Sequence, residues 1–183
     1  MQLRDGDLIA RPWQDGDADA LYRAVDASRA ELSHWLAWCS PAYVRDDAAA
    51  WIAYSQHAWQ QRSAFPFGVF DAAGNLLGSV GINSLDAENR RGALGYWMAT
   101  AQAGRGFARR AAVLAVEFAF AELGLQRIEI LVQPDNAASH KVAQALGARC
   151  EGEARARLQF RGRALNMVVY GLLPEDRTAP AAG

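Results

Sequence analysis

The chain has 183 residues, of which 51% are hydrophobic and 21% charged, and its formal net charge at pH 7 is −1. We therefore expect one globular domain with a substantial core and no overall electrostatic signature of nucleic-acid binding. No apolar run approaches the roughly 18–20 residues that span a membrane, and the N-terminus has no signal-peptide core. Cys39 and Cys150 form neither a CxxC pair nor a disulfide framework, so the reducing cytoplasm is the expected compartment.

The first half of the chain predicts one strand, two helices and three further strands. Pro12 ends the first strand, and the polar run at residues 15–17 caps the first helix. Asp46 and Asp47 open the second helix, where the helix dipole favours acidic residues. The elements are expected at Leu8–Trp13, Ala18–Ala37, Asp46–Gln61, Phe65–Phe70, Leu76–Ile82 and Ala93–Met98.

The second half of the chain predicts two helices and three strands. Apolar residues from Phe107 to Ala121 recur at three- and four-residue spacing, and Gly124 ends that helix. A shorter helix follows Pro134 and runs to Leu146. The strands are expected at Arg127–Val132, whose nearly continuous apolar residues indicate burial, and at Cys150–Arg157 and Ala164–Leu173.

The element order is therefore β-α-α-β-β-β-α-β-α-β-β. It predicts an α+β (mixed α/β) fold with a mixed sheet of about seven strands flanked by about four helices. A doubly wound dinucleotide domain is disfavoured because strands and helices do not alternate regularly. Residues 1–173 are predicted to form one domain, and 174–183 a flexible C-terminal tail.

A glycine-containing turn precedes the first helix of the second half. Gly104 and Gly106 flank Arg105, and Arg109 and Arg110 follow. Free N–H groups and the dipole at a helix start bind anions, whereas cations there are disfavoured by about 0.3–1 kcal/mol each. A phosphate group is therefore the expected ligand. The turn lacks the first glycine of the GxGxxG motif and the Lys-Ser/Thr of a P-loop.

Three features together resemble the GNAT superfamily of N-acetyltransferases, over roughly residues 7–173. The first is the element order. The second is the run Ala103–Ala108 (Ala-Gly-Arg-Gly-Phe-Ala), which looks like the family's (Arg/Gln)-x-x-Gly-x-(Gly/Ala) coenzyme A loop. The third is Asn-Ala-Ala-Ser at 136–139, with Leu-Gly-Ala at 146–148 where the family usually has Leu-Gly-Phe.

Two further segments resemble the branch that acetylates the N-termini of ribosomal proteins. They are the strand Leu-Gly-Tyr-Trp-Met at 94–98 and the early Leu-x-x-Arg-Pro-Trp at 8–13. The resemblance implies one N-acetyltransferase domain with a mostly antiparallel, strongly twisted sheet. The chain departs from the family pattern at Ala103, where the loop usually begins with Arg or Gln, and at Ala93, where the family often has Glu. The usual source of a general base is therefore missing at position 93.

The resemblance also implies a coenzyme A site made of the turn, the preceding strand and the next helix start. Backbone N–H groups of the turn would hold the pyrophosphate, and the strand backbone would bind the pantetheine arm. Asn136 would contact pantetheine, although the residue alone reads equally as a helix N-cap. Ser139 would protonate the leaving thiolate and is the candidate catalytic residue. The cofactor-binding candidates are Trp97, Met98, Thr100, Gly104, Arg105, Gly106, Phe107, Ala108, Arg109, Asn136 and Ser139.

Tryptophans are concentrated between the first helix and the second strand, which suggests an acceptor site there. Trp35 or Trp38 is a candidate to line an acceptor cleft near Pro41, together with the last hairpin. Core packing is the alternative role for these rings. An α-amine has a pKa near 7.8, so about a tenth of it is neutral at pH 7, and a water relay could suffice as base. Side-chain candidates for the base are Glu31, His34, His57 and Asp86, each with a structural or surface role as the alternative.

The implied reaction is direct attack of a primary amine on acetyl-CoA, without a metal. The acceptor is expected to be the N-terminal α-amine of a ribosomal-protein-like substrate. A small amine (an amino acid, polyamine or antibiotic) is the first alternative, and a non-catalytic acyl-CoA-binding sensor the second. The expected partners are acetyl-CoA and one of these amines, with no direct nucleic-acid or membrane contact. Strand edges in the last hairpin would allow a homodimer.

Overall fold

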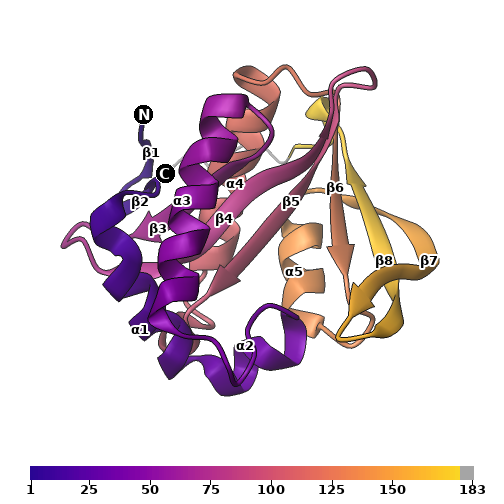
Figure 1. Cartoon of the computed structure of the whole chain (residues 1–183). Coiled ribbons are helices and arrows are strands. Elements are labelled where there is room, and N and C mark those ends of the chain that lie inside the picture. The colour runs from indigo at the N-terminus through magenta and orange to yellow at the C-terminus, as the bar shows by residue number, and fades with distance from the viewer. Residues whose placement is uncertain (178–183) are drawn as a thin grey trace.

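Eight strands form one sheet in the computed structural model, which describes residues 1–177 (Figure 1). Their spatial order is β1-β2-β3-β4-β5-β6-β8-β7, and β5–β6 is the one parallel pair among the described strands. The predicted mixed, mostly antiparallel sheet is confirmed. The strands are β1 Leu3–Asp5, β2 Leu8–Pro12, β3 Phe65–Phe70, β4 Leu76–Asp86, β5 Arg91–Met98, β6 Arg127–Val132, β7 Arg149–Phe160 and β8 Arg163–Leu172.

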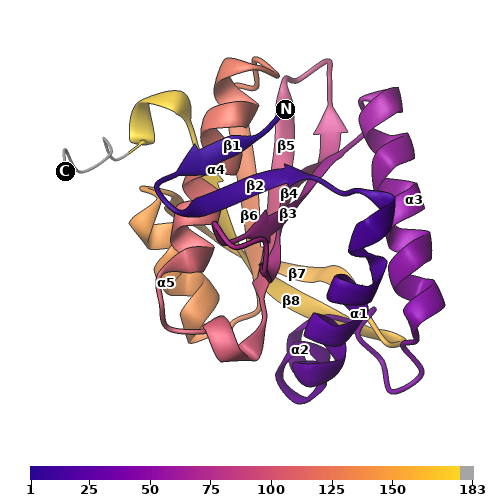
Figure 2. The ribbon, with the colours of Figure 1, turned by 90° about the vertical axis from the view of Figure 1, so that its left-hand side faces the viewer.

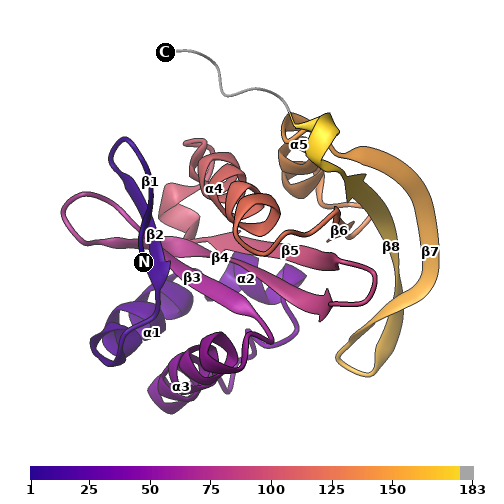
Figure 3. The same cartoon turned by 90° about the horizontal axis from the view of Figure 1, so that it is seen from above.

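Helices cover both faces of this sheet, and Figure 3 shows α1, α2 and α3 on one face and α4 and α5 on the other. One cluster of buried side chains joins α4 and the sheet, with Phe67, Ile128 and Ala115 fully buried in it. A second cluster lies under α1 to α3 and includes Val25 and Ile52. The helices are α1 Ala18–Ala27, α2 Arg29–Trp35, α3 Arg45–Gln61, α4 Phe107–Ala121 and α5 Ala137–Ala145.

Two features of the N-terminal region differ from the sequence prediction. The short strand β1 pairs with β2 around Gly6, whose φ of +54° suits a tight turn that glycine adopts readily. The single helix expected over 18–37 is divided at Ser28 into α1 and α2. Ser28 is 2% exposed, and its Oγ accepts a hydrogen bond from the Thr100 amide at 3.0 Å. This contact between distant segments fixes the break, and helical periodicity does not reveal it.

The parallel strands β5 and β6 pair over only three positions and then diverge. Their register runs from Arg91↔Arg127 to Ala93↔Glu129. Beyond that point β5 stays paired with β4, whereas β6 pairs with β8. Figure 1 shows the two strands separating toward α5. The edge of β5 from Leu94 to Met98 therefore has no strand partner on the β6 side.

The β1–β2 hairpin packs against α4 through ion pairs. Arg110 Nε lies 2.6 Å from an Asp5 carboxylate oxygen, and Arg110 Nη2 lies 2.8 Å from Asp7 Oδ1. Figure 2 shows this hairpin in front of α4. The first residues of the predicted tail form a 3₁₀ turn at Pro174–Asp176, and residues 178–183 lie outside the described residues. Across residues 1–177, no helix has the length and apolarity to cross a membrane.

Candidate active site

The glycine turn before α4 presents unpaired backbone amides. Gly104 and Gly106 have φ angles of +74° and +78°, a left-handed conformation that glycine adopts without strain. A Cβ at either position would meet no atom within 4 Å, so conformation rather than packing explains both glycines. In the described chain, the amides of residues 104–106 donate no hydrogen bond. They adjoin the free N–H groups of the first turn of α4, and this group of donors fits a pyrophosphate.

The arginines of the turn differ in how their charges are used. Arg105 donates to Gln102 Oε1 at 2.6 Å, and its guanidinium lies 5.0 Å from the centre of the Phe107 ring. Arg109 is exposed. Arg110 is held by Asp5 and Asp7, and it lowers the pKa of Asp7. The expected crowding of unpaired cations at this helix start is therefore partly relieved within the protein, which leaves Arg109 as the most available charge.

Ser139, at the start of α5, meets Tyr96 of β5 in the gap that opens between β5 and β6. The two hydroxyl oxygens are 2.8 Å apart, where either can donate, and the Tyr96 hydroxyl donates to the Ser139 carbonyl at 3.2 Å. Burial raises the pKa of Tyr96, so its hydroxyl stays protonated and can donate to Ser139. Asn136 Oδ1 accepts from the Ser139 amide at 3.0 Å, so Asn136 is the N-cap of α5 and positions Ser139.

The remaining cofactor candidates lie along the free end of β5 and just beyond it. Trp97 turns its ring toward the α1–α3 face, where it lies 6.0 Å from the Trp38 ring. Met98 packs partly buried against the core on the α4 side. The Thr100 amide donates a hydrogen bond to Ser28 Oγ, and Thr100 Oγ1 donates one to Glu31 Oε2 at 3.1 Å. Thr100 therefore fastens the end of β5 to α2.

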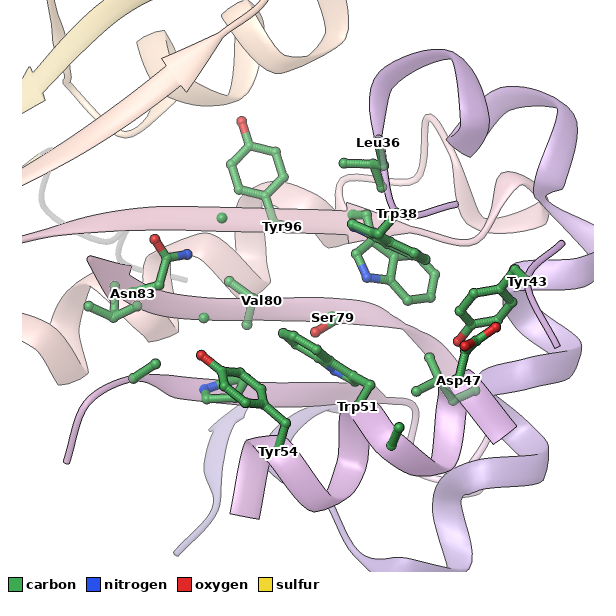
Figure 4. Close-up of a pocket in the computed structure, with 18 of the residues that line it drawn as sticks. Leu36, Trp38, Tyr43, Asp47, Trp51, Tyr54, Ser79, Val80, Asn83 and Tyr96 are labelled. Carbon is green, nitrogen blue, oxygen red and sulfur yellow. The ribbon is translucent and has the colours of Figure 1, made fainter. Parts of the chain in front are cut away.

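A cavity of about 990 Å³ lies on the α1–α3 face of the sheet (Figure 4). Residues 79–84 of β4 and 95–97 of β5 form its floor. Trp51 and Tyr54 of α3 form one wall, and the segment 36–43 with Trp38 forms another. Of the two tryptophans predicted to line an acceptor cleft, Trp38 lines this cavity. Trp35 does not line the cavity; its carbonyl accepts from Gln133 Nε2 at 2.9 Å.

None of the four side chains considered as a general base lines this cavity. Glu31 accepts from Thr100, and the His34 ring lies 4.3 Å from the Trp35 ring. His57 is exposed on α3. Asp86 pairs with Arg91 at 3.0 Å, and hydrogen bonds from Asn89, together with Arg91, lower the pKa of Asp86 to about 2. The last hairpin also contributes no cavity residue, but Arg161 at its tip donates to the Cys39 carbonyl at 2.9 Å.

Glu129 is a residue that no sequence pattern indicates. It is the partner of Ala93 where β5 and β6 last pair, so it stands beside the position where the family often has Glu. On β6 the alternate residues Ile128 and Ile130 are buried in the core on the α4 side, and Glu129 therefore faces the other side of the sheet. Its carboxylate is 3.3 Å from Arg127 and 3.7 Å from Arg157. Only the strand register brings Glu129 to this place.

The chain is similar to known acetyltransferases in sequence and in fold. Residues 7–149 match the family described as acetyltransferase (GNAT) domain. "Putative ribosomal N-acetyltransferase YdaF" of Bacillus subtilis (strain 168) is 28% identical over 174 residues, 92% of each chain. "Uncharacterized N-acetyltransferase p20" of Bacillus licheniformis is 33% identical over 101 residues, which are 55% of this chain and 57% of that protein.

Solved structures show the same fold. The structure titled "putative ribosomal-protein-serine acetyltransferase" from Vibrio cholerae has a TM-score of 0.85 and 27% identity, covering 95% of this chain and 98% of that one. A RimL ribosomal L7/L12 α-N-protein acetyltransferase, solved in complex with coenzyme A, has a TM-score of 0.85 and 20% identity, covering 94% and 98%. With the family match over most of its length and a glycine turn beside a splayed strand pair, this chain is a member of the GNAT acetyltransferase family.

Proposed function

We propose that this acetyltransferase moves the acetyl group of acetyl-CoA to the N-terminal α-amine of a protein. The observation that carries the proposal is the arrangement around the free edge of β5. The amides at 104–106 lie beyond one end of that edge, Ser139 and Tyr96 meet across the gap, and the cavity opens on the other face. The ribosomal N-acetyltransferase names of YdaF and of the Vibrio cholerae structure support a protein acceptor.

Acetyl-CoA supplies a thioester whose carbonyl carbon a neutral amine attacks. The amides at 104–106 and the start of α4 hold the pyrophosphate, and the unpaired edge of β5 orients the pantetheine arm. As the carbon–sulfur bond breaks, Ser139 Oγ gives its proton to the thiolate, and the Tyr96 hydroxyl, 2.8 Å away, turns to donate to Ser139 Oγ. Ser139 regains a proton from solvent water before the next turnover. Glu129 does not line the cavity, so it receives the proton that the amine loses through a water.

A small-amine acceptor is the second candidate, because a cavity of about 990 Å³ holds a whole small molecule as easily as a peptide end. A non-catalytic acyl-CoA sensor is the third, since Ala93 replaces the family's frequent Glu. Glu129 weighs against the sensor, because its pairing with Ala93 places a carboxylate beside that position.

Free-thiol release from acetyl-CoA distinguishes the three functions. The acceptors are peptides that begin with different residues, the same peptides with a blocked N-terminus, and small amines. We expect release with free N-termini and none with blocked ones. Release with small amines alone would favour the second candidate, and tight coenzyme A binding without release on any acceptor would favour the sensor. Ser139→Ala is the control that separates enzymatic release from background hydrolysis.

A further inference from the structure

The cavity beside β5 is poor in charge for its size. Of its lining residues, all within the described chain, Asp47 is the one with a formal charge at neutral pH. One oxygen of Asp47 already accepts from the Val44 amide at 2.8 Å. Burial raises the pKa of Tyr43 to about 12, so that hydroxyl adds no charge to the same wall. A polycationic acceptor would need several carboxylates to replace its hydration and balance its charge, and this cavity offers one.

The cavity walls are instead aromatic and solvent-exposed. Trp38, Trp51 and Tyr54 are 45%, 41% and 53% exposed, although large apolar side chains usually lie inside. The rings of Trp51 and Tyr54 are 5.4 Å apart on α3, and Trp38 lies across the cavity from them (Figure 4). Exposed aromatic surface that faces a cavity marks a binding site for apolar groups.

These aromatic walls adjoin the reaction centre. The ring centres of Trp38 and Trp97 are 6.0 Å apart. Trp97 belongs to residues 95–97 of β5, which line the cavity and also border the gap between β5 and β6. Tyr96, the next residue, turns to the other side and reaches Ser139. An amine that lies on the cavity floor beside residues 95–97 therefore has its substituent between Trp38 and the Trp51–Tyr54 pair.

The wall that carries Trp38 is also held in place before any acceptor arrives. Arg29 donates to the carbonyls of Ser40 and Tyr43, and it pairs with Asp26 at 2.6 Å. The Trp38 and Tyr43 rings are 5.8 Å apart. A wall fixed in this way provides a shaped surface at little entropic cost to binding.

We propose that the acceptor is an amine with a single positive charge and a large apolar or aromatic group within a few bonds of the nitrogen. This inference rests on the proposed function and names the class of acceptor for the same site. The chemistry is shared by a peptide N-terminus whose first residues include Phe, Leu or Met and by an arylalkyl monoamine. A polyamine or an amino sugar does not have it.

Acetyl-CoA turnover on matched acceptors tests the inference. The peptide arm compares N-terminal tetrapeptides that differ only in carrying Phe, Leu, Ala or Lys at the first or second position. The small-molecule arm compares phenethylamine with spermidine. We expect kcat/KM to be about tenfold or more higher for the apolar member of each pair, as burial of one large side chain predicts. The arm with the higher kcat/KM identifies whether the source is a peptide or a small amine.

Variants of the walls localise the effect. Trp51→Ala and Tyr54→Ala should reduce the preference for apolar acceptors to a few-fold and leave the KM for acetyl-CoA unchanged. Val44→Ala is the matched control, because Val44 is 51% exposed near the same helix and does not line the cavity. It should retain the full preference.

Each outcome has a distinct meaning. Equal kcat/KM for Phe and Ala peptides, or a preference for Lys or spermidine, would overturn the inference and leave the acetyltransferase proposal standing. No thiol release with any acceptor would instead contradict the proposed function. A dimer of the wild-type protein that Trp51→Ala dissociates, with no change in acceptor preference, would assign the aromatic walls to contact between two copies and overturn the inference.

Discussion

The Tyr96 and Ser139 hydroxyl oxygens lie 2.8 Å apart and join β5 to α5 across the gap between β5 and β6. If Ser139 protonates the leaving thiolate, Ser139→Ala should lower kcat by about 10²–10⁴-fold, the range typical of general acid catalysis. Tyr96→Phe should lower it by a smaller factor, because Ser139 keeps its own proton. Both variants should retain coenzyme A affinity, measured by calorimetry. A large loss of that affinity with unchanged kcat would assign the pair to coenzyme binding instead.

Glu129 and Ala93 are paired neighbours on one face of the sheet. The proposed base can therefore be tested by moving its carboxylate from position 129 to position 93. Glu129→Gln should lower kcat by about a hundredfold or more without weakening coenzyme A binding. Adding Ala93→Glu to that variant should recover about tenfold of the loss, since the new carboxylate lies one strand away on the same face. If Glu129→Gln keeps the wild-type kcat and adding Ala93→Glu does not raise it, Glu129 serves only its ion pairs with Arg127 and Arg157.

The coenzyme turn requires a test that does not disturb its backbone. Glutamate at Gly106 would be strained, because φ there is +78°. Ala108 is in the first turn of α4 and tolerates a side chain, so Ala108→Glu should place a like charge beside the pyrophosphate and weaken coenzyme A binding about tenfold or more. Ala121→Glu, exposed at the other end of α4, is the control and should bind normally. Unchanged affinity in Ala108→Glu would contradict the assignment of the turn.

Local sequence patterns predicted much of this site, and contacts between distant segments explain what they missed. The apolar spacing of α4 and the glycines at 104 and 106 are local signals, and both indicate the proposed anion site. The break at Ser28 depends on the Thr100 amide, 72 positions away. The pairing of Glu129 with Ala93 depends on the register between β5 and β6, and the sequence of neither strand alone indicates that register. The contact between Tyr96 and Ser139 likewise joins two segments 43 positions apart, and neither segment alone indicates it.

The contact between β6 and β7 predicts how stability depends on pH. Arg127 makes two hydrogen bonds to the Glu151 carboxylate, at 2.6 and 2.5 Å, and lowers the pKa of that carboxyl below 4.5. A carboxyl with a lowered pKa in the folded state contributes stability above its unfolded pKa and loses it as the pH falls through the folded pKa. Glu151→Gln should therefore reduce the free energy of unfolding at pH 7 by about 0.5–1 kcal/mol, and the difference from wild type should shrink below about pH 4.5.

A substitution at Gly171 tests the same ion pair between Arg127 and Glu151. It lies on β8 between the two partners, and a Cβ there would come within 2.2 Å of Glu151 Oε1 and 2.6 Å of Arg127 Nη1. Gly171→Ala should displace the Glu151 carboxylate. The double variant with Glu151→Gln should therefore lose less free energy of unfolding at pH 7 than the sum of the two single losses. Urea denaturation at several pH values measures both effects, with Glu88→Gln, a substitution of another exposed glutamate, as the control. Strict additivity of the two variants at pH 7 would show that the ion pair and Gly171 act independently.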